Sequence, residues 1–204
     1  MDDKAHWERV YTSKSAREVS WYQPHADQSL ALIQRVASAS PCRVIDVGGG
    51  ASTLVDDLLA LGGFEVSVLD ISEAALKVSK DRLGPSQQQV RWLVGDIATI
   101  ELPRAAYDVW HDRAVFHFMT TARERAAYVA QVRRAVRPGG HVIVAAFGPE
   151  GPLQCSGLPV MRYKPDALHA EFGSAFELVE HKTENHRTPA GRIQQFVYCH
   201  CLMQ

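Results

Sequence analysis

The stretch VIDVGGGAST, from Val44 to Thr53, places three consecutive glycines directly behind an aspartate, at the end of a short apolar run. Leu54, Val55, Leu58 and Leu59 follow at helical spacing, and two further glycines end that pattern. An apolar run, a bare turn and an amphipathic segment predict a strand, a tight turn and a helix. The glycines let a ligand approach the backbone of the turn closely.

The same alternation continues on the carboxyl side of this stretch and predicts parallel β-α units. Helical patterns follow the second strand, with Ser72 as N-cap and Gly84-Pro85 as its end, and precede the fifth strand, over residues 121–140. The five predicted strands are CRVIDV (42–47), FEVSVLD (64–70), QVRWLV (89–94), YDVWHD (107–112) and HVIVAAF (141–147).

Additional segments flank this alternating region on both sides. Two helices are expected before it, over residues 2–13 and 26–38, joined by an aromatic connection. After it comes a glycine- and proline-rich loop that is too long for an ordinary connection, and then a short helix at 166–173. The β-rich runs 176–184 and 192–203 are expected to pair as an antiparallel hairpin.

Composition excludes several classes of partner. With 22 Lys and Arg against 23 Asp and Glu, the net charge is −1, which gives no electrostatic reason to bind nucleic acid or an anionic membrane. The longest apolar run, His141 to Phe147, is too short to span a bilayer, and the N-terminus lacks a secretory apolar segment. The four cysteines show no metal-binding spacing. We expect a soluble, cytoplasmic protein without a metal.

A glycine-rich turn of this kind suits a nucleotide triphosphate, a dinucleotide or S-adenosylmethionine. The phosphate loop requires a lysine before the helix, and none stands between Gly48 and Asp56. The dinucleotide fingerprint would require glycine where Thr53 stands, which weakens that alternative without excluding it. Asp46 would repel a pyrophosphate but suits a ligand that carries a sulfonium and an ammonium, which favours S-adenosylmethionine.

Two further acids lie after the next two strands. Asp70 ends the second strand, where its carboxylate can accept hydrogen bonds from both ribose hydroxyls. Asp96 follows the third strand, where it can accept from the exocyclic amine of adenine. Ile71 and Ile97 can pack against the adenine ring.

In order and spacing, the segments VIDVGGGAS, VSVLDIS, VRWLVGDI, YDVWHDRAVFHF and RAVRPGGHVIVAAF resemble the class I S-adenosylmethionine-dependent methyltransferases. The resemblance covers roughly residues 40–150. It implies an α/β, Rossmann-like, doubly wound sheet of seven mostly parallel strands with a C-terminal antiparallel hairpin strand. We expect one domain over 1–204: an N-terminal helical cap (1–40), a cofactor-binding core (41–147), and an acceptor loop, short helix and terminal hairpin (148–204).

The resemblance also assigns cofactor contacts residue by residue. Apart from the resemblance, Trp21 and Tyr22 can cover the methyl donor, where aromatic faces favour a sulfonium, or line an apolar pocket; plain packing of the N-terminal helix is the equal alternative. No [ND]-P-P-[YF] motif follows the fourth strand, which lowers the expectation of amino methylation on a nucleobase or amide. The expected cofactor-binding residues are Asp46, Gly48, Gly49, Gly50, Asp70, Ile71, Asp96, Ile97, Trp21 and Tyr22.

The residues of the reacting end are less firmly defined. His111, Asp112 and His117 follow the fourth strand and are candidates for a general base, although each can equally serve packing or loop geometry. For the acceptor, Cys155, Arg162, Tyr163 and His186 are candidates; they can also be loop anchors. Cys155 and His186, with Cys199 and Cys201, would favour a thiol-dependent acceptor such as a metalloid only if they met in space.

The sequence thus predicts S-adenosylmethionine-dependent methyl transfer by in-line displacement, with a small-molecule acceptor. A Trp-x-x-x-Tyr element at Trp7 and Tyr11 is similar to that of small methyltransferases that modify protein lysines, so a protein acceptor is the alternative. A non-catalytic module that binds S-adenosylmethionine or a partner, and an NAD-dependent oxidoreductase, are alternatives from other classes.

Overall fold

The computed structural model describes residues 3–204 and contains a seven-stranded sheet in the order β3-β2-β1-β4-β5-β9-β8. Strand β9 pairs antiparallel with both of its neighbours, and the pairings among β1 to β5 are parallel. The strands are β1 (Cys42–Val47), β2 (Phe64–Asp70), β3 (Val90–Val94), β4 (Tyr107–Arg113), β5 (Val136–Phe147), β8 (Phe176–Arg187) and β9 (Ile193–Met203).

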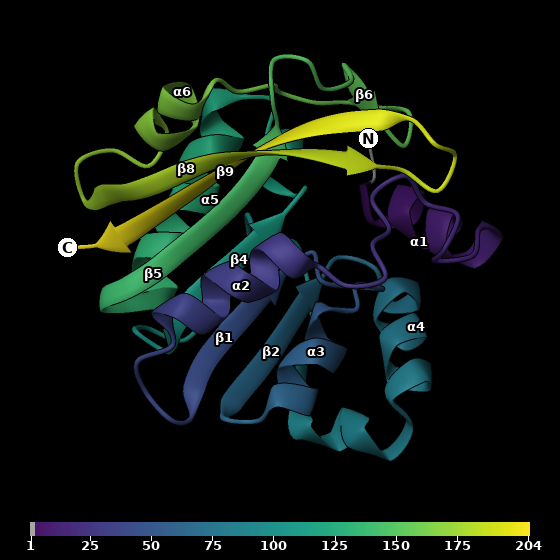
Figure 1. Cartoon of the computed structure of the whole chain (residues 1–204), viewed down its shortest axis with the longest axis horizontal. Coiled ribbons are helices and arrows are strands. Elements are labelled where there is room, and N and C mark those ends of the chain that lie inside the picture. The colour runs from purple at the N-terminus through teal and green to yellow at the C-terminus, as the bar shows by residue number, and fades with distance from the viewer. Residues whose placement is uncertain (1–2) are drawn as a thin grey trace.

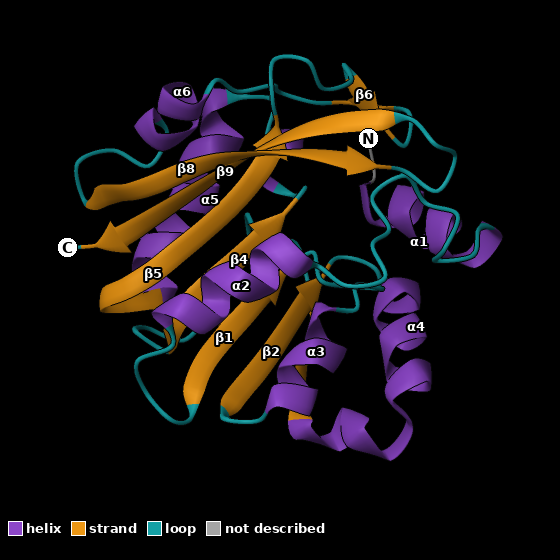
Figure 2. Cartoon of the chain, in the orientation of Figure 1, coloured by secondary structure: helices purple, strands orange, loops and turns teal. Residues whose placement is uncertain are grey.

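Helices cover both faces of the sheet, so the predicted doubly wound architecture is confirmed (Figure 1, Figure 2). Helices α2 (Asp27–Val36), α3 (Leu54–Leu61) and α4 (Glu73–Leu83) bury their apolar side chains in one core. Helices α5 (Ala122–Ala135) and α6 (Pro165–Ala170) bury theirs in a second core on the opposite face. Helix α1 (Asp3–Ser13) contacts α4 beside the sheet, at the carboxyl ends of the strands (Figure 1).

The helix ends follow from local sequence. The Ser72 side chain accepts from the Ala75 amide at 3.1 Å and caps α4, as predicted. Helix α5 begins with a capping box in which Thr121 and Glu124 satisfy each other's backbone amides. One boundary prediction is wrong: residues 136–140 belong to β5, because Val136 pairs with Tyr107 and Arg137 donates to Asp108.

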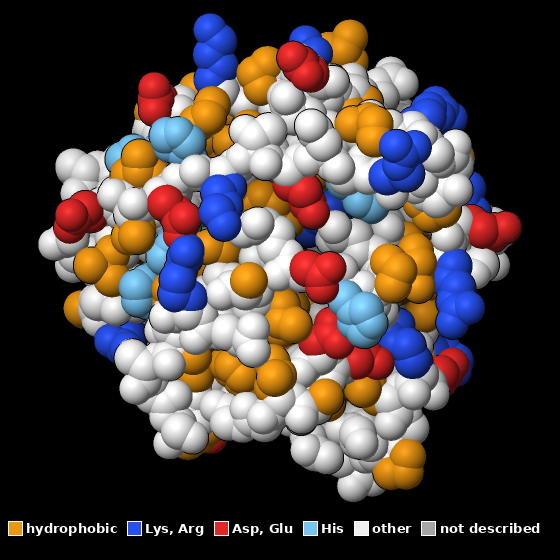
Figure 3. Space-filling view, in the orientation of Figure 1, with side chains coloured by type: hydrophobic (Ala, Val, Ile, Leu, Met, Phe, Trp, Pro, Cys, Tyr) orange, Lys and Arg blue, Asp and Glu red, His pale blue; other side chains and the backbone are white. Residues whose placement is uncertain are grey.

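The long loop after β5 folds into a small hairpin, β6 (Gln154–Cys155) and β7 (Leu158–Pro159). The predicted terminal hairpin is present and longer than expected, since β8 extends to Arg187 and leaves a short turn before β9. On the face shown in Figure 3, acidic and basic side chains are interspersed. Among residues 3–204, no helix has the length and apolar character needed to cross a membrane.

Candidate active site

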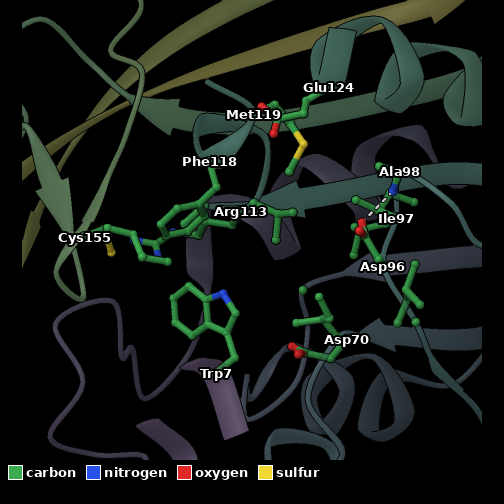
Figure 4. A pocket seen from close by; sticks show the side chains of 18 of the residues that line it. Trp7, Asp70, Asp96, Ile97, Ala98, Arg113, Phe118, Met119, Glu124 and Cys155 are labelled. Carbon is green, nitrogen blue, oxygen red and sulfur yellow. Dashed lines mark hydrogen bonds between the residues drawn. The ribbon is translucent and has the colours of Figure 1, made fainter. Parts of the chain in front are cut away.

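A cavity of about 370 Å³ opens at the carboxyl ends of β1, β2 and β4. In a doubly wound sheet, ligands bind at this edge, where the strand order reverses. The volume lies in the ordinary range for small-molecule sites, roughly 300–1,000 Å³. Figure 4 shows Asp70 and Asp96 on one side of the cavity and Phe118 and Cys155 on the opposite side, with Trp7 between them.

The two acids predicted to hold adenosine both line this cavity, as do Ile71 and Ile97. Asp70 is only 7% exposed, and its Oδ1 accepts from the Ser72 amide at 2.9 Å. Burial raises the pKa of Asp70 to about 7, mainly because the charged form is desolvated. The Asp96 side chain accepts from the Ala98 amide at 2.8 Å, which fixes its turn at the cavity edge (Figure 4).

The glycine turn is shaped by close approaches that a side chain would prevent. Gly48 adopts a φ of +69°, a conformation that favours glycine. A Cβ on Gly49 would lie 2.4 Å from Asp46 Oδ2, and a Cβ on Gly50 would lie 2.5 Å from Asp70 Oδ2. The turn therefore packs directly against the two acids at the ends of β1 and β2.

A second, smaller cavity of about 50 Å³ lies on the other side of the turn and is lined by Asp46, Gly49, Tyr22 and His111 among others. Asp46 Oδ1 lies 2.7 Å from His111 Nδ1, whereas the buried Asp46 Oδ2 has no hydrogen-bond partner among residues 3–204. A buried carboxylate oxygen without a partner is costly, and a ligand ammonium would satisfy it.

The two cavities meet at a junction, because four residues line both of them. These are Tyr11, Trp21, Gly48 and Arg113. An elongated ligand with adenosine in the larger cavity and an amino-acid group in the smaller one would place its centre at this junction. The residues present therefore fit S-adenosylmethionine, with aromatic side chains at the position of the sulfonium.

Helix α1 forms a roof over the larger cavity. The Trp7 ring lies 5.2 Å from that of Phe118 and 5.7 Å from that of Trp21, both in edge-to-face geometry. The Glu8 carboxylate accepts from the Glu73 and Ala74 amides, at 2.7 and 3.2 Å, and so binds the N-terminus of α4. Helix α1 is thereby attached to the element that follows Asp70.

None of the three candidate general bases lines the larger cavity. Asp112 is fully buried on the α5 face, where it accepts from Tyr128 Oη at 2.5 Å and from the Val115 and Phe116 amides. His117 is also fully buried, against Phe118 and Phe147, and desolvation lowers its pKa to about 3. Strand alternation explains why Asp112 lies away from the cavity: its side chain and that of Arg113, which lines the cavity, point to opposite faces of the sheet.

His111 borders only the smaller cavity. Its Nε2 lies 2.8 Å from Ser29 Oγ, and its Nδ1 is engaged by Asp46, so both ring nitrogens have partners. This arrangement orients the Asp46 carboxylate toward the glycine turn. His111 is therefore placed to position a cofactor contact and not to reach an acceptor in the larger cavity.

Asp112→Ala is expected to destabilise the protein by about 3 kcal/mol, since three donors lose a buried acceptor. Denaturant unfolding at pH 7.5 measures this change. Burial raises the Asp112 pKa to about 6, so the desolvation cost of the charged form is felt above pH 6 and relieved below it. The loss should therefore be larger at pH 5 than at pH 7.5. A variant as stable as the wild type at both pH values would contradict this structural role.

Of the four candidate acceptor residues, the structure places only Cys155 in the cavity. Arg162 is exposed and donates to the Pro149 and Gly151 carbonyls, which anchors the loop. Tyr163 is buried against Phe116, and His186 Nε2 lies 2.8 Å from the Ser20 carbonyl. None of these three lines the larger cavity, and their contacts fit the alternative of loop anchoring.

The cysteines and His186 do not form one cluster. Cys199 and Cys201 have their sulfur atoms 3.3 Å apart, but they are buried in the core beneath α5 and α6. Cys155 packs in the opposite core, and burial raises the pKa of its thiol to about 12. The arrangement gives no support to a thiol-dependent metalloid site.

Several cavity residues were not predicted to line it. Trp7 and Tyr11 lie four residues apart on α1, and their spacing places both on one helix face. Arg113 ends β4 directly after Asp112. Because successive side chains of a strand point to opposite faces, the sequence could have shown that Arg113 lies on the other face from Asp112. Phe118 and Met119 lie at the end of a short 3-10 turn, and Leu158 and Pro159 form β7; no local sequence pattern predicted that these segments fold over the cavity.

The strand order, the antiparallel β9 and a glycine turn between two acids together define a class I, Rossmann-like cofactor-binding fold. Solved structures have this fold over the whole chain. A methyltransferase from Anabaena variabilis covers 100% of this chain with a TM-score of 0.76 at 13% identity, over 96% of its own length. A protein solved in work on echinomycin biosynthesis, where a disulfide becomes a thioacetal, covers 99% with a TM-score of 0.78 at 18% identity, over 92% of its own length.

Sequence comparison agrees with the fold. Residues 44–140 match the methyltransferase domain family. The mouse eEF1A lysine and N-terminal methyltransferase is 24% identical over 68% of this chain and 20% of its own length. A ubiquinone/menaquinone biosynthesis C-methyltransferase from Methylobacterium nodulans is 31% identical over 60% of this chain and 50% of its own. This chain thus spans between a fifth and a half of these curated relatives.

The match over residues 44–140, together with the fold, identifies a methyltransferase domain of the class I, S-adenosylmethionine-dependent type in this chain.

Proposed function

We propose that the protein transfers a methyl group from S-adenosylmethionine to a small, largely apolar acceptor in the cytoplasm. The observation that supports this most is the shape of the larger cavity. Of the three acids that line it, Asp70 and Asp96 lie on one side and Glu124 lies beside Met119, and an apolar chamber lies on the side opposite Asp70 and Asp96. The chamber is lined by Trp7, Phe118, Cys155, Leu158 and Pro159.

We assign the cofactor contacts as follows. Asp70 would accept from the ribose hydroxyls, and Asp96 from the adenine amine. Ile71 and Ile97 would pack on the ring, and Asp46 Oδ2 would accept from the amino-acid ammonium through its free lone pairs. Gly48, Gly49 and Gly50 leave room for this approach, while Trp21 and Tyr22 lie beside the junction and the smaller cavity.

Chemically, the cofactor supplies a methyl carbon activated by the adjacent sulfonium. The protein's contribution is to align the acceptor with that carbon and to exclude water. The roof formed by α1 and the β6–β7 hairpin would exclude water, and the aromatic side chains of Trp7, Trp21 and Phe118 would orient an apolar acceptor. We propose no proton transfer by His111, Asp112 or His117, because none of them lines the chamber.

The acceptor class can be tested with methyl-labelled S-adenosylmethionine and lysate separated into protein and small-molecule pools. We expect label in apolar small molecules. Trp92→Phe, on β3 and outside the cavity, serves as a control that should keep the activity. Label that appears only in protein would overturn the proposal.

A protein lysine acceptor is the second candidate, and its support is the similarity to the mouse eEF1A lysine and N-terminal methyltransferase. The roof that α1 forms over part of the cavity favours a small molecule over a protein side chain. A third outcome, tight binding of S-adenosylhomocysteine without labelling of either pool, would indicate a non-catalytic binding module. Binding of NAD alone in a calorimetric titration would contradict the cofactor assignment.

A further inference from the structure

The junction between the two cavities contains a buried positive charge. Arg113 lines both cavities, and its side chain is only 9% exposed. In Figure 4 it lies beside Phe118 and near Trp7. In the proposed arrangement of the cofactor, the sulfonium lies close to this guanidinium. Two like charges in a partly buried site repel strongly, so the site needs a compensating charge.

The contacts of Arg113 show why it is retained at this position. Its Nη1 donates to the Trp21 carbonyl at 3.2 Å, and its Nε donates to Tyr198 Oη at 3.2 Å. The guanidinium also stacks on Phe196, 4.2 Å from the ring centroid. Arg113 therefore fixes the backbone of Trp21, the aromatic residue at the junction, against the antiparallel strand β9.

The compensating charge comes from Glu184 on β8. Its Oε2 lies 3.4 Å from Arg113 Nη2 and accepts from Tyr198 Oη at 3.2 Å. Its Oε1 accepts from the Gln23 side chain at 2.9 Å, so the carboxylate is held on both oxygens. Glu184 is 20% exposed and is absent from the lining of both cavities. It can therefore act on a ligand only through Arg113 and through its field.

The same group of side chains continues to the cofactor loop. Tyr198 Oη lies 3.3 Å from Ser29 Oγ, which in turn contacts His111, the partner of Asp46. Asp46 and Glu184 lie at the two ends of this hydrogen-bonded series of side chains. Both are acids, and their charge is opposite to that of the sulfonium and ammonium groups expected at the junction. The two carboxylates outweigh the single positive charge of Arg113, so the net charge of these three side chains around the junction is negative.

We propose that Glu184 is a specificity-determining residue that favours the cationic methyl donor over the neutral product by cancelling the charge of Arg113 at the junction. This inference rests on the proposed function. It predicts an effect on the ratio of two affinities, because S-adenosylmethionine and S-adenosylhomocysteine differ at the junction by one methyl group and one positive charge. A role of Glu184 in folding alone would weaken both ligands alike.

The test is calorimetric titration of Glu184→Gln with both ligands. We expect binding of S-adenosylmethionine to weaken about tenfold and binding of S-adenosylhomocysteine to change less than about twofold. Glu180→Gln is a matched control, since Glu180 lies on the same strand, is 27% exposed and pairs with Arg35 away from the cavities. It should leave both affinities unchanged.

Arg113→Met provides a second test with the opposite sign. It leaves the Glu184 carboxylate without its positively charged partner. The ratio of the two affinities should therefore shift toward S-adenosylmethionine even if both ligands bind less tightly. Equal losses for both ligands in Glu184→Gln, or an equal shift in Glu180→Gln, would overturn the inference. If Glu184→Gln fails to fold, an unchanged ratio in Arg113→Met overturns it. A wild-type protein that binds neither ligand would instead overturn the proposed function, and this inference with it.

Discussion

Replacing Asp70 with alanine is expected to weaken binding of S-adenosylhomocysteine about 100-fold while the protein remains folded. Its carboxylate is placed to accept from two ribose hydroxyls, and hydrogen bonds to charged groups contribute about 1.5–3 kcal/mol each. The variant loses both of these hydrogen bonds, and the removal of a desolvated carboxylate offsets part of that loss. The net loss of binding free energy is about 3 kcal/mol, which corresponds to about a factor of 100 in affinity. Calorimetric titration measures the change.

Asp81→Ala is the matched control, because Asp81 lies on the exposed face of α4 and pairs with Lys77 outside the cavity. It should bind the ligand as the wild type does. Asp96→Ala should have a smaller effect than Asp70→Ala, since Asp96 is exposed at the cavity edge and its hydrogen bonds compete with water. Unchanged affinity in both cavity variants would show that adenosine is held elsewhere.

Asp70 also predicts a pH dependence. Because burial raises its pKa to about 7, the carboxyl of the free protein is protonated below pH 7, whereas the ribose hydroxyls are bound best by the carboxylate. Ligand affinity should therefore fall as the pH is lowered from 8 to 6, by up to about tenfold per pH unit. Stability of the free protein should change in the opposite sense, since the cost of the buried charge grows as the pH rises through 7. In Asp70→Asn, the affinity should vary little with pH.

The fold could be predicted from the sequence because its signals are local and repeated. Each parallel strand is a short apolar run followed by a turn, and each helix has its own cap, as with Ser72 and Gly84. The acids Asp70 and Asp96 occupy the ends of successive strands, so the sheet itself brings them to one edge. The end of α5 was misplaced because the pairing of Val136 with Tyr107 is a tertiary contact that local propensity does not report.

The reacting end could not be predicted because its residues come from segments distant in the chain. Trp7 reaches the cavity on a helix whose Glu8 docks on α4, 65 residues further along the chain, and its ring packs on Phe118. Asp112 was misassigned because its position at a strand end is the same for a ligand contact and for a turn anchor. Only the direction of its side chain, toward Tyr128, separates the two roles.

Removing the roof provides the second large effect. Trp7→Ala is expected to lower kcat/KM for the small-molecule acceptor by about 10–100-fold, because it removes aromatic contacts to Trp21 and Phe118 worth about 1 kcal/mol each and admits water to the chamber. Glu8→Gln keeps the Trp7 side chain and removes the charge that binds the α4 amides, so it should produce a smaller loss of the same kind. Steady-state kinetics with labelled methyl donor measures both.

The comparison of these two variants separates a roof from a simple packing contact. If α1 acts as a docked roof, Glu8→Gln and Trp7→Ala should raise KM for acceptor and donor together, since both ligands share the cavity beneath it. Trp92→Phe removes part of a tryptophan on β3, outside the cavity, and should leave the kinetics unchanged. Wild-type kinetics in Trp7→Ala would refute a functional roof over the chamber, and that roof is the feature that favours a small-molecule acceptor over a protein side chain at this site.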